Sequence, residues 1–264
     1  MSIIDALVLG ILQGLTEFLP VSSSGHIEIG KALLHTEVAD NLLFSILVHG
    51  ATTLSTIVVF RKDIGSIIKG LLQFRYNTET QYTLKILISM IPVGIAGIFF
   101  KDDIEQLFTG NMLLVGTMLL ITAALLSFAY FRKPDRGDVT YGKAFLIGIS
   151  QAFAILPGLS RSGATISTAL LTGISKEKAA RFSFLMVLLP IIGAVILELK
   201  DYIDNPLITE GISGISLSVG FVAAFLSGIV ACTWMINIVK KGKLIYFAIY
   251  CTIIGIIAIT TYFI

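Results

Sequence analysis

Charged residues are scarce in this chain. Only 14% of its 264 residues are Asp, Glu, Lys or Arg, whereas soluble globular domains carry roughly 25%. Hydrophobic residues make up 55% of the sequence, and the mean hydropathy is +0.91. So few charged side chains exclude an ordinary soluble domain of this length and predict an integral membrane protein.

Cysteine and net charge are also low. Cys232 and Cys251 both fall in apolar stretches without metal-ligand spacing, so we expect packed thiols rather than a disulfide or a metal site. The formal net charge of +2 and the dispersed basic residues predict no nucleic-acid partner. The N-terminal stretch lacks both a basic region and a small-residue cleavage site, so we expect no cleaved signal peptide.

Long apolar runs are abundant instead. A helix needs about 20 such residues to cross a hydrocarbon core of about 30 Å, and lipid forces the backbone to satisfy its own hydrogen bonds. The expected fold is therefore an all-α polytopic membrane protein with six transmembrane helices. The runs cover residues 42–60, 84–100, 112–131, 182–199, 214–238 and 244–263.

The connections between these runs carry unequal charge. In membrane proteins the connections rich in Lys and Arg usually lie on the cytoplasmic side. This bias assigns the basic connections to the cytoplasm and the acidic ones to the exterior, and it places both termini outside. We expect a multi-pass protein of the cell membrane. The basic connections are 61–75, 132–143, 176–181 and 240–243, and the acidic ones are 102–105 and 201–210.

Two further apolar stretches, 2–34 and 144–173, enter and leave on one side under this orientation. Each is broken in the middle by proline, serine and glycine. Because a lipid-exposed helix cannot continue through such a break, we expect two re-entrant helix pairs that line a polar cavity.

The two broken stretches are related by a constant offset. Three spans separate them, an odd number, so the second copy is inverted relative to the first. The single membrane domain is therefore predicted to consist of inverted repeats, approximately 1–131 and 139–264. In such folds the broken helices direct their N-termini at an anionic ligand near the membrane midplane. An offset of 138 aligns Gly10 with Gly148, Gln13 with Gln151, Ser22 with Ser160, Ser24 with Ser162, Gly25 with Gly163, Phe44 with Phe182 and Ser45 with Ser183.

Arg161 lies at the centre of the second broken stretch, beside Ser160, Ser162 and Gly163. A guanidinium can bind two phosphate oxygens at once, and neighbouring hydroxyl and backbone N–H groups can hold the others. The alternative is a structural arginine paired with a carboxylate. Functional use is favoured because ionisable groups at this depth are expensive to bury.

In the first copy, Gln13 and Glu17 share one helix face, and Pro20 ends that helix before the run Ser22–His26. Glu17 could hold a cation or act as a base, His26 could shuttle a proton, and a serine could be the nucleophile or a phosphate ligand. The spacing leaves these roles open. The alternatives are a capping glutamate, a structural histidine and serines that let helices pack closely.

The segments QGLTEFLPVSSSGH (13–26) and LPGLSRSGATIS (156–167) resemble the two signature segments of the undecaprenyl-diphosphate phosphatases, the bacitracin-resistance type of integral membrane phosphatase. The resemblance extends through nearly the whole chain. It implies hydrolysis of undecaprenyl diphosphate to undecaprenyl phosphate and inorganic phosphate. Because the first re-entrant stretch enters from outside, we expect the site to open to the exterior. A lipid or anion transporter with the same inverted repeat is the alternative, but a carrier has no need of a paired nucleophile and base.

The resemblance implies catalytic roles for four residues: Glu17 as the essential carboxylate, His26 as proton carrier or nucleophile, Ser23 as the competing nucleophile and Arg161 as the diphosphate clamp. It also implies a divalent cation, Mg²⁺ or Ca²⁺, on Glu17 with Gln13, although many members have a second glutamate where this chain has Gln13. The expected partners are the polyprenyl diphosphate lipid and the lipid bilayer, and a homodimer is left open. The residues expected to line the substrate pocket are Gln13, Ser22, Ser24, Gly25, Gln151, Ser160, Ser162, Gly163 and Thr165.

Overall fold

The computed structural model describes residues 1–264 except 35–41, 101–105, 108–110, 134–135, 205–212 and 264. The predicted acidic connection 102–105 and most of 201–210 lie outside the described residues. The described residues contain helices and no strand beyond one isolated bridge between Gly137 and Ile174. The all-α prediction is confirmed for this part of the chain.

The helices follow the predicted runs closely. Their bounds are α1 (Ile3–Phe18), α2 (Ser23–Leu34), α3 (Leu42–Val59), α4 (Arg61–Leu71), α5 (Thr78–Phe99), α7 (Met112–Phe131), α8 (Tyr141–Phe153), α9 (Arg161–Leu171), α10 (Lys176–Met186), α11 (Leu188–Asp204), α12 (Gly214–Lys241) and α13 (Ile245–Tyr262).

Within the described residues, five helical segments are long and apolar enough to cross a membrane, and α3 with α4, which are bent by 76°, make a sixth if counted as one span. The protein is therefore a multi-pass membrane protein. Two spans begin earlier than predicted: residue 78 instead of 84, and 176 instead of 182. Hydropathy identifies the first apolar residue of a span, whereas a helix begins at its capping residue. In α5 the Asn77 side chain caps the helix by accepting a hydrogen bond from the Thr80 N–H at 2.8 Å.

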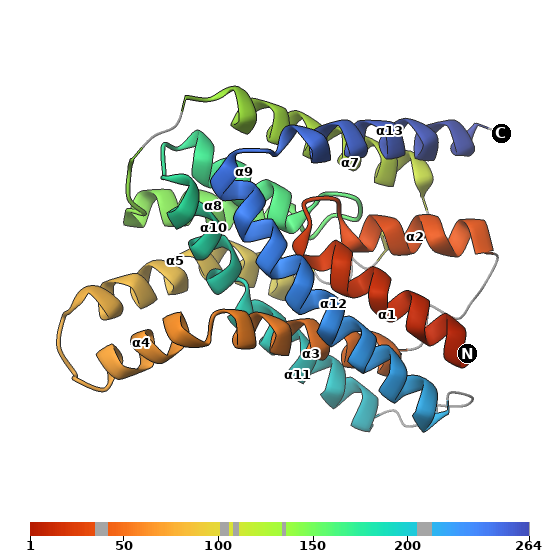
Figure 1. Ribbon diagram of the computed structural model, residues 1–264, viewed down its shortest axis with the longest axis horizontal. Coiled ribbons are helices and arrows are strands. Elements are labelled where there is room, and N and C mark those ends of the chain that lie inside the picture. The colour runs from red at the N-terminus through yellow and green to blue at the C-terminus, as the bar shows by residue number, and fades with distance from the viewer. Residues whose placement is uncertain (35–41, 101–105, 108–110, 134–135, 205–212, 264) are drawn as a thin grey trace.

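The two broken stretches form helix hairpins. In Figure 1 the hairpin α1–α2 and the hairpin α8–α9 approach the middle of the molecule from opposite sides, and their connecting turns meet there. Both chain termini lie at the same end of the molecule. The site described below is formed where the two turns meet.

Glycines let the first helix of each hairpin pack directly on a long helix. α1 packs along α12 and α8 packs along α5. A Cβ on Gly10 would lie 2.4 Å from the carbonyl oxygen of Gly220, and one on Gly148 would lie 2.2 Å from that of Ser89. Only a residue without a side chain permits this approach. Gly10 and Gly148 are related by the offset of 138.

Aromatic packing fixes the C-terminal end of α1. The buried ring of Phe18 lies with its centroid 6.1 Å from that of Phe184, and Phe184 lies 6.0 Å from Phe60. Such tilted contacts hold rings in defined positions. Glu17, one residue before Phe18, is thereby held at the centre of the molecule.

Candidate active site

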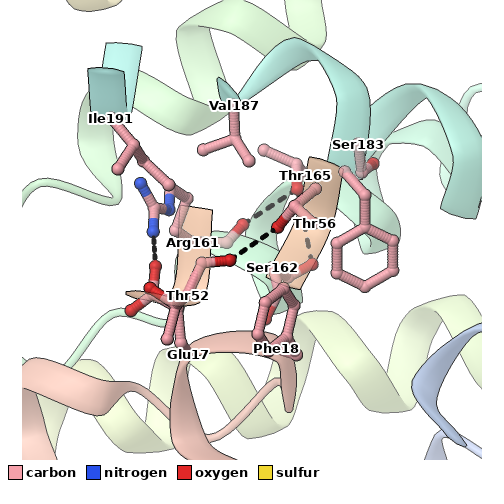
Figure 2. A pocket seen from close by; sticks show the side chains of 11 residues that line it. Glu17, Phe18, Thr52, Thr56, Arg161, Ser162, Thr165, Ser183, Val187 and Ile191 are labelled. Atoms are coloured by element: carbon pink, nitrogen blue, oxygen red, sulfur yellow. Dashed lines mark hydrogen bonds and ion pairs between the residues drawn. The ribbon is translucent and has the colours of Figure 1, made fainter. Parts of the chain in front are cut away.

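An ion pair joins the two hairpins. Nη2 of Arg161, the first residue of α9, binds Oε1 of Glu17 in the last turn of α1 (Figure 2). The Glu17 side chain is 4% exposed and that of Arg161 is 31% exposed. Removing either partner would leave a charge deep in a low-dielectric region, so the two groups stabilise each other's burial. Arg161 is therefore paired with a carboxylate, the contact that the sequence analysis gave as the alternative to phosphate binding.

The second oxygen of Glu17 is held from its own hairpin. Oε2 accepts hydrogen bonds from Gln13 Nε2 at 3.1 Å and from Ser23 Oγ at 3.0 Å. The expected shared face of Gln13 and Glu17 is thus present as a direct contact. A carboxylate beside a serine hydroxyl is the arrangement in which a base can accept the hydroxyl proton.

The turn before α9 is fixed by its hydroxyls. Ser160 Oγ caps α9 by accepting from Gly163 N–H at 3.1 Å and lies 3.3 Å from Ser162 Oγ. The Ser160 N–H donates to Thr122 Oγ1 at 3.0 Å, and Ser162 Oγ donates to the Leu19 carbonyl at 3.0 Å. The last bond ties the second hairpin to the turn of the first.

The turn before α2 repeats this pattern. Ser22 Oγ accepts from Gly25 N–H at 3.2 Å and lies 3.3 Å from Ser24 Oγ. One difference separates the turns: Ser22 has φ +70°, in the left-handed region, whereas Ser160 has φ −68°. A serine with positive φ is strained and needs local support.

Two cavities adjoin the ion pair, and Glu17 and Arg161 line both. The larger has a volume of about 300 Å³, and the smaller, shown in Figure 2, holds about 20 Å³, room for roughly one water molecule. Of the predicted site residues, the larger cavity is lined by Glu17, Ser22, Ser23, Ser24, Ser160 and Arg161, and the smaller by Glu17, Arg161, Ser162 and Thr165.

Four predicted residues stand behind the cavity walls. Gly25 and Gly163 contribute backbone N–H groups to the serine caps. Gln13 and Gln151 are each 1% exposed and line neither cavity. Gln13 Oε1 and both amide atoms of Gln151 have no hydrogen-bond partner among the described residues. Gln13 therefore acts on the site through Glu17.

His26 faces another way. It lines a groove of about 640 Å³ between α1, α12 and α13, together with Trp234 and Tyr250. Nδ1 lies 2.8 Å from the Ser22 carbonyl oxygen and Nε2 lies 2.7 Å from the Tyr250 hydroxyl. His26 lines neither cavity beside Arg161, so the structure does not bring it together with the other three predicted catalytic side chains.

Helix α3 also contributes to the site, and its two threonines were not among the predicted site residues. His49 lines the larger cavity, and Thr52 and Thr56 line the smaller. Thr52 Oγ1 donates to the His49 carbonyl at 3.0 Å, and Thr56 Oγ1 donates to the Thr52 carbonyl at 3.1 Å. The signal is present in the sequence, because polar residues at 49, 52 and 56 form one stripe along a mostly apolar span.

The fit to a divalent cation is limited. Among the described residues no group of three or more His, Cys, Asp or Glu side chains is placed to hold a metal ion. Glu17 is the one acid lining the described part of the larger cavity, and Gln13 Oε1 is a buried neutral oxygen without a partner among the described residues. Mg²⁺ commonly takes one or two carboxylates and completes its shell with substrate phosphates and water. These residues fit such a cation when the ligand supplies further oxygens.

The fold and the site define a class: a polytopic helical membrane protein in which two helix hairpins hold a buried carboxylate–guanidinium pair beside a hydroxyl-lined cavity. The sequence model of the family described as Bacitracin resistance protein BacA matches residues 6–257, and the chain belongs to this family.

Similar proteins carry one name. The chain is 56% identical over 260 residues to the undecaprenyl-diphosphatase of Parabacteroides distasonis, covering 98% of each chain. It is 57% identical over 256 residues to that of Bacteroides fragilis, covering 97% of this chain and 96% of the relative. A more distant undecaprenyl-diphosphatase, from Salinibacter ruber, is 39% identical over 95% of this chain and 96% of its own.

Proposed function

We propose that this protein is an undecaprenyl-diphosphate phosphatase, which hydrolyses undecaprenyl diphosphate to undecaprenyl phosphate and inorganic phosphate and so recycles the carrier lipid of peptidoglycan and other cell-wall polymers. The names and coverage of its relatives support the reaction. The observation within the molecule that carries it is the Glu17 carboxylate, bound on one oxygen by Ser23 and on the other by Arg161.

Arg161 is the group that binds the diphosphate in this proposal. It lines the cavity of about 300 Å³ together with Ser160 and the serines of the first turn. Phosphoryl transfer needs positioning and neutralisation of charge on the phosphoryl oxygens more than covalent assistance from the protein. A planar guanidinium at the N-terminus of α9 supplies both, and the helix dipole adds to the positive potential.

In this proposal Ser23 is the nucleophile and Glu17 is the base that accepts its proton. Ser23 Oγ gives its proton to Glu17 Oε2, 3.0 Å away, as it bonds to the terminal phosphorus and the bridging P–O bond breaks. Undecaprenyl phosphate leaves and takes that proton from Glu17. Glu17 then accepts a proton from the water that attacks the phosphoserine and returns it to Ser23 Oγ as inorganic phosphate is released. In the competing route a water molecule attacks the phosphorus directly and gives its proton to Glu17 in place of the Ser23 hydroxyl. Ser23→Ala separates the two routes.

The cation remains part of the proposal. Glu17, with Gln13 Oε1 behind it, would hold Mg²⁺ or Ca²⁺ together with the oxygens of the diphosphate. Such an ion supplies charge neutralisation at the phosphoryl oxygens.

The finer topology is also proposed. α1 and α8 begin 138 residues apart, as do α2 and α9, and the two serine caps share one hydrogen-bond pattern. These relations support inverted repeats at 1–131 and 139–264 with two re-entrant hairpins. Both termini at one end of the molecule fit six crossings. We propose that the cavity opens to the exterior of the cell membrane.

Cysteine labelling tests this orientation, since the native Cys232 and Cys251 are buried. Cysteines at the exposed positions Gln106 and Ser213 should react with an impermeant thiol reagent in intact cells. A cysteine at Arg132 should react only after permeabilisation. The reversed pattern would move the cavity to the cytoplasmic side.

The decisive experiment is phosphate release from undecaprenyl diphosphate by the purified protein in detergent, with and without a chelator. Release that stops in chelator and returns with Mg²⁺ or Ca²⁺ supports both the reaction and the cation. Transport of the lipid without phosphate release would favour the transporter alternative. The mass of the solubilised particle tests the homodimer.

A further inference from the structure

His26 and Tyr250 are in contact although they lie 224 positions apart in the sequence. The His26 Nε2 atom lies 2.7 Å from the Tyr250 hydroxyl, and the two rings stack with an angle of 8° between their planes and centroids 5.6 Å apart. Tyr250 is in α13, whereas His26 is in the first turn of α2. Neither residue lines a cavity beside Arg161.

The chemistry of the two partners fixes the proton on the ring. A backbone carbonyl oxygen can only accept, so the His26 nitrogen 2.8 Å from the Ser22 carbonyl, Nδ1, carries the hydrogen. In the neutral ring Nε2 is then the acceptor, and the Tyr250 hydroxyl is the donor. Both nitrogens are occupied by protein, and neither is directed at the cavity.

The carbonyl held by His26 belongs to the strained turn. Ser22 has φ +70°, a conformation that a serine keeps only with support. Its carbonyl accepts from His26 Nδ1 at 2.8 Å and from the His26 backbone N–H at 3.1 Å. The next residue is Ser23, whose hydroxyl reaches Glu17 at 3.0 Å. The conformation of Ser22 thus sets the direction of Ser23.

The other half of the sequence serves as an internal comparison. At the offset of 138, Ala164 stands for His26 and Met112 for Tyr250. That turn keeps the serine cap, but Ser160 has an ordinary φ of −68°. The left-handed serine therefore occurs in the turn that His26 contacts, with Tyr250 behind it.

We infer that Tyr250 is a positioning residue: through Nε2 it fixes the tautomer of His26, whose Nδ1–H holds the Ser22 turn and aims Ser23 at Glu17. This inference rests on the proposed phosphatase activity for its kinetic test. It gives His26 a role in place of the proton carrier or nucleophile that the sequence predicted.

Tyr250→Phe keeps the stacked ring and removes the donor. We expect kcat for undecaprenyl diphosphate to fall at least about fivefold while KM changes less than about twofold, because Arg161 still binds the diphosphate. Tyr246→Phe is the matched control, since Tyr246 lies one turn earlier in α13 and lines the same groove. Both of its constants should stay within about twofold of wild type.

A second pair of variants separates positioning from chemistry. In His26→Asn the amide NH₂ can replace Nδ1–H as donor to the Ser22 carbonyl, whereas His26→Ala has no donor. We expect the asparagine variant to retain at least about tenfold more activity than the alanine variant. Equal inactivity of the two would overturn the inference, because a nucleophile or proton carrier is lost in both.

Nitrogen NMR of ¹⁵N-histidine-labelled protein gives a readout independent of turnover. His26 should appear as the Nδ1–H tautomer, and Tyr250→Phe should shift its Nε2 signal. An Nε2–H tautomer in wild type, or wild-type kcat in a folded Tyr250→Phe, would refute the positioning role of Tyr250. If the wild-type protein releases no phosphate, the proposed function fails, and the tautomer of His26 still tests the positioning role of Tyr250. If Tyr250→Phe does not fold, the wild-type tautomer and the His26 pair decide it.

Discussion

Ser23 and Arg161 are separated by the offset of 138 that relates the two halves of the sequence, and their side chains end on one carboxylate. Ser23 Oγ donates to Oε2 of Glu17 at 3.0 Å, and Arg161 Nη2 binds Oε1. One turn therefore supplies a hydroxyl and the other a fixed positive charge. The two turns related by the offset therefore bring different chemical groups to Glu17.

Arg161→Lys should fold and lose at least about tenfold in turnover, roughly 1.4 kcal/mol of transition-state stabilisation, because a lysine keeps the charge but not the two-pronged donor. Arg161→Ala should be worse, since it leaves Glu17 and the diphosphate unpaired. Turnover of purified protein, with thermal stability as the folding check, measures both. A folded Arg161→Ala with wild-type turnover would rule out the proposed site.

Ser23→Ala removes the hydroxyl that lies against Glu17 and should lower kcat by at least about 100-fold if Ser23 is the nucleophile. Ser24→Ala, which loses only the 3.3 Å contact with Ser22 Oγ, should lose less than about tenfold. Similar effects of the two substitutions would indicate that water, and not Ser23, attacks the phosphorus.

Gln13→Glu places a second carboxylate beside Glu17, where Gln13 Nε2 now donates at 3.1 Å. Two adjacent carboxylates repel unless a cation lies between them, so we expect activity to persist and the half-maximal cation concentration to fall. Glu17→Gln should abolish turnover. Cation titrations of the three proteins test this, and full activity of Glu17→Gln in chelator would contradict the scheme.

Gly14→Ala should destabilise the contact between α1 and α12. The added Cβ would lie 2.0 Å from Ser227 Oγ and 2.5 Å from the Ala224 carbonyl oxygen, and such overpacking typically costs about 1–3 kcal/mol. Gly94→Ala in α5 is the control, because its Cβ meets nothing within 4 Å and alanine favours helix by up to about 1 kcal/mol. Melting temperatures in one detergent should move in opposite directions.

Asp138, in the connection between α7 and α8, gives a small pH effect. Its hydrogen bond with Lys178 holds the pKa of this carboxyl below its usual 3.8. A depressed folded-state pKa contributes stability above the unfolded value, and that stability is lost as pH falls through the folded value. Asp138→Asn should therefore lower the melting temperature slightly at pH 7, and the difference should shrink as pH falls below 3.8. High salt should reduce the difference, since both side chains are substantially exposed.

The helices could be predicted because lipid imposes a simple requirement: apolar runs of sufficient length, interrupted only where a polar cavity accepts the break. Within the two hairpins the sequence also indicated which residues share a face. It could not pair Glu17 with Arg161, since that contact spans 144 positions and depends on how two separate turns meet.

The direction of His26 was beyond sequence reasoning for a related reason. Spacing placed it among the reactive serines, but its ring turns back onto the Ser22 carbonyl and outward to Tyr250, a residue 224 positions away. Thr52 and Thr56 were visible as a polar stripe on α3, yet only the packing of α3 against the site assigns them to the inner cavity.

The pairing of Glu17 with Arg161 also bears on which molecules compete for the site. At rest the guanidinium is already neutralised, so a small free anion such as inorganic phosphate meets no net positive charge and must displace a carboxylate held by the protein. A diphosphate anchored by a long hydrocarbon chain has high local concentration at the membrane and more charge to exchange for Glu17. The resting ion pair thus discriminates against the reaction's own water-soluble product, which keeps turnover from stalling as phosphate accumulates.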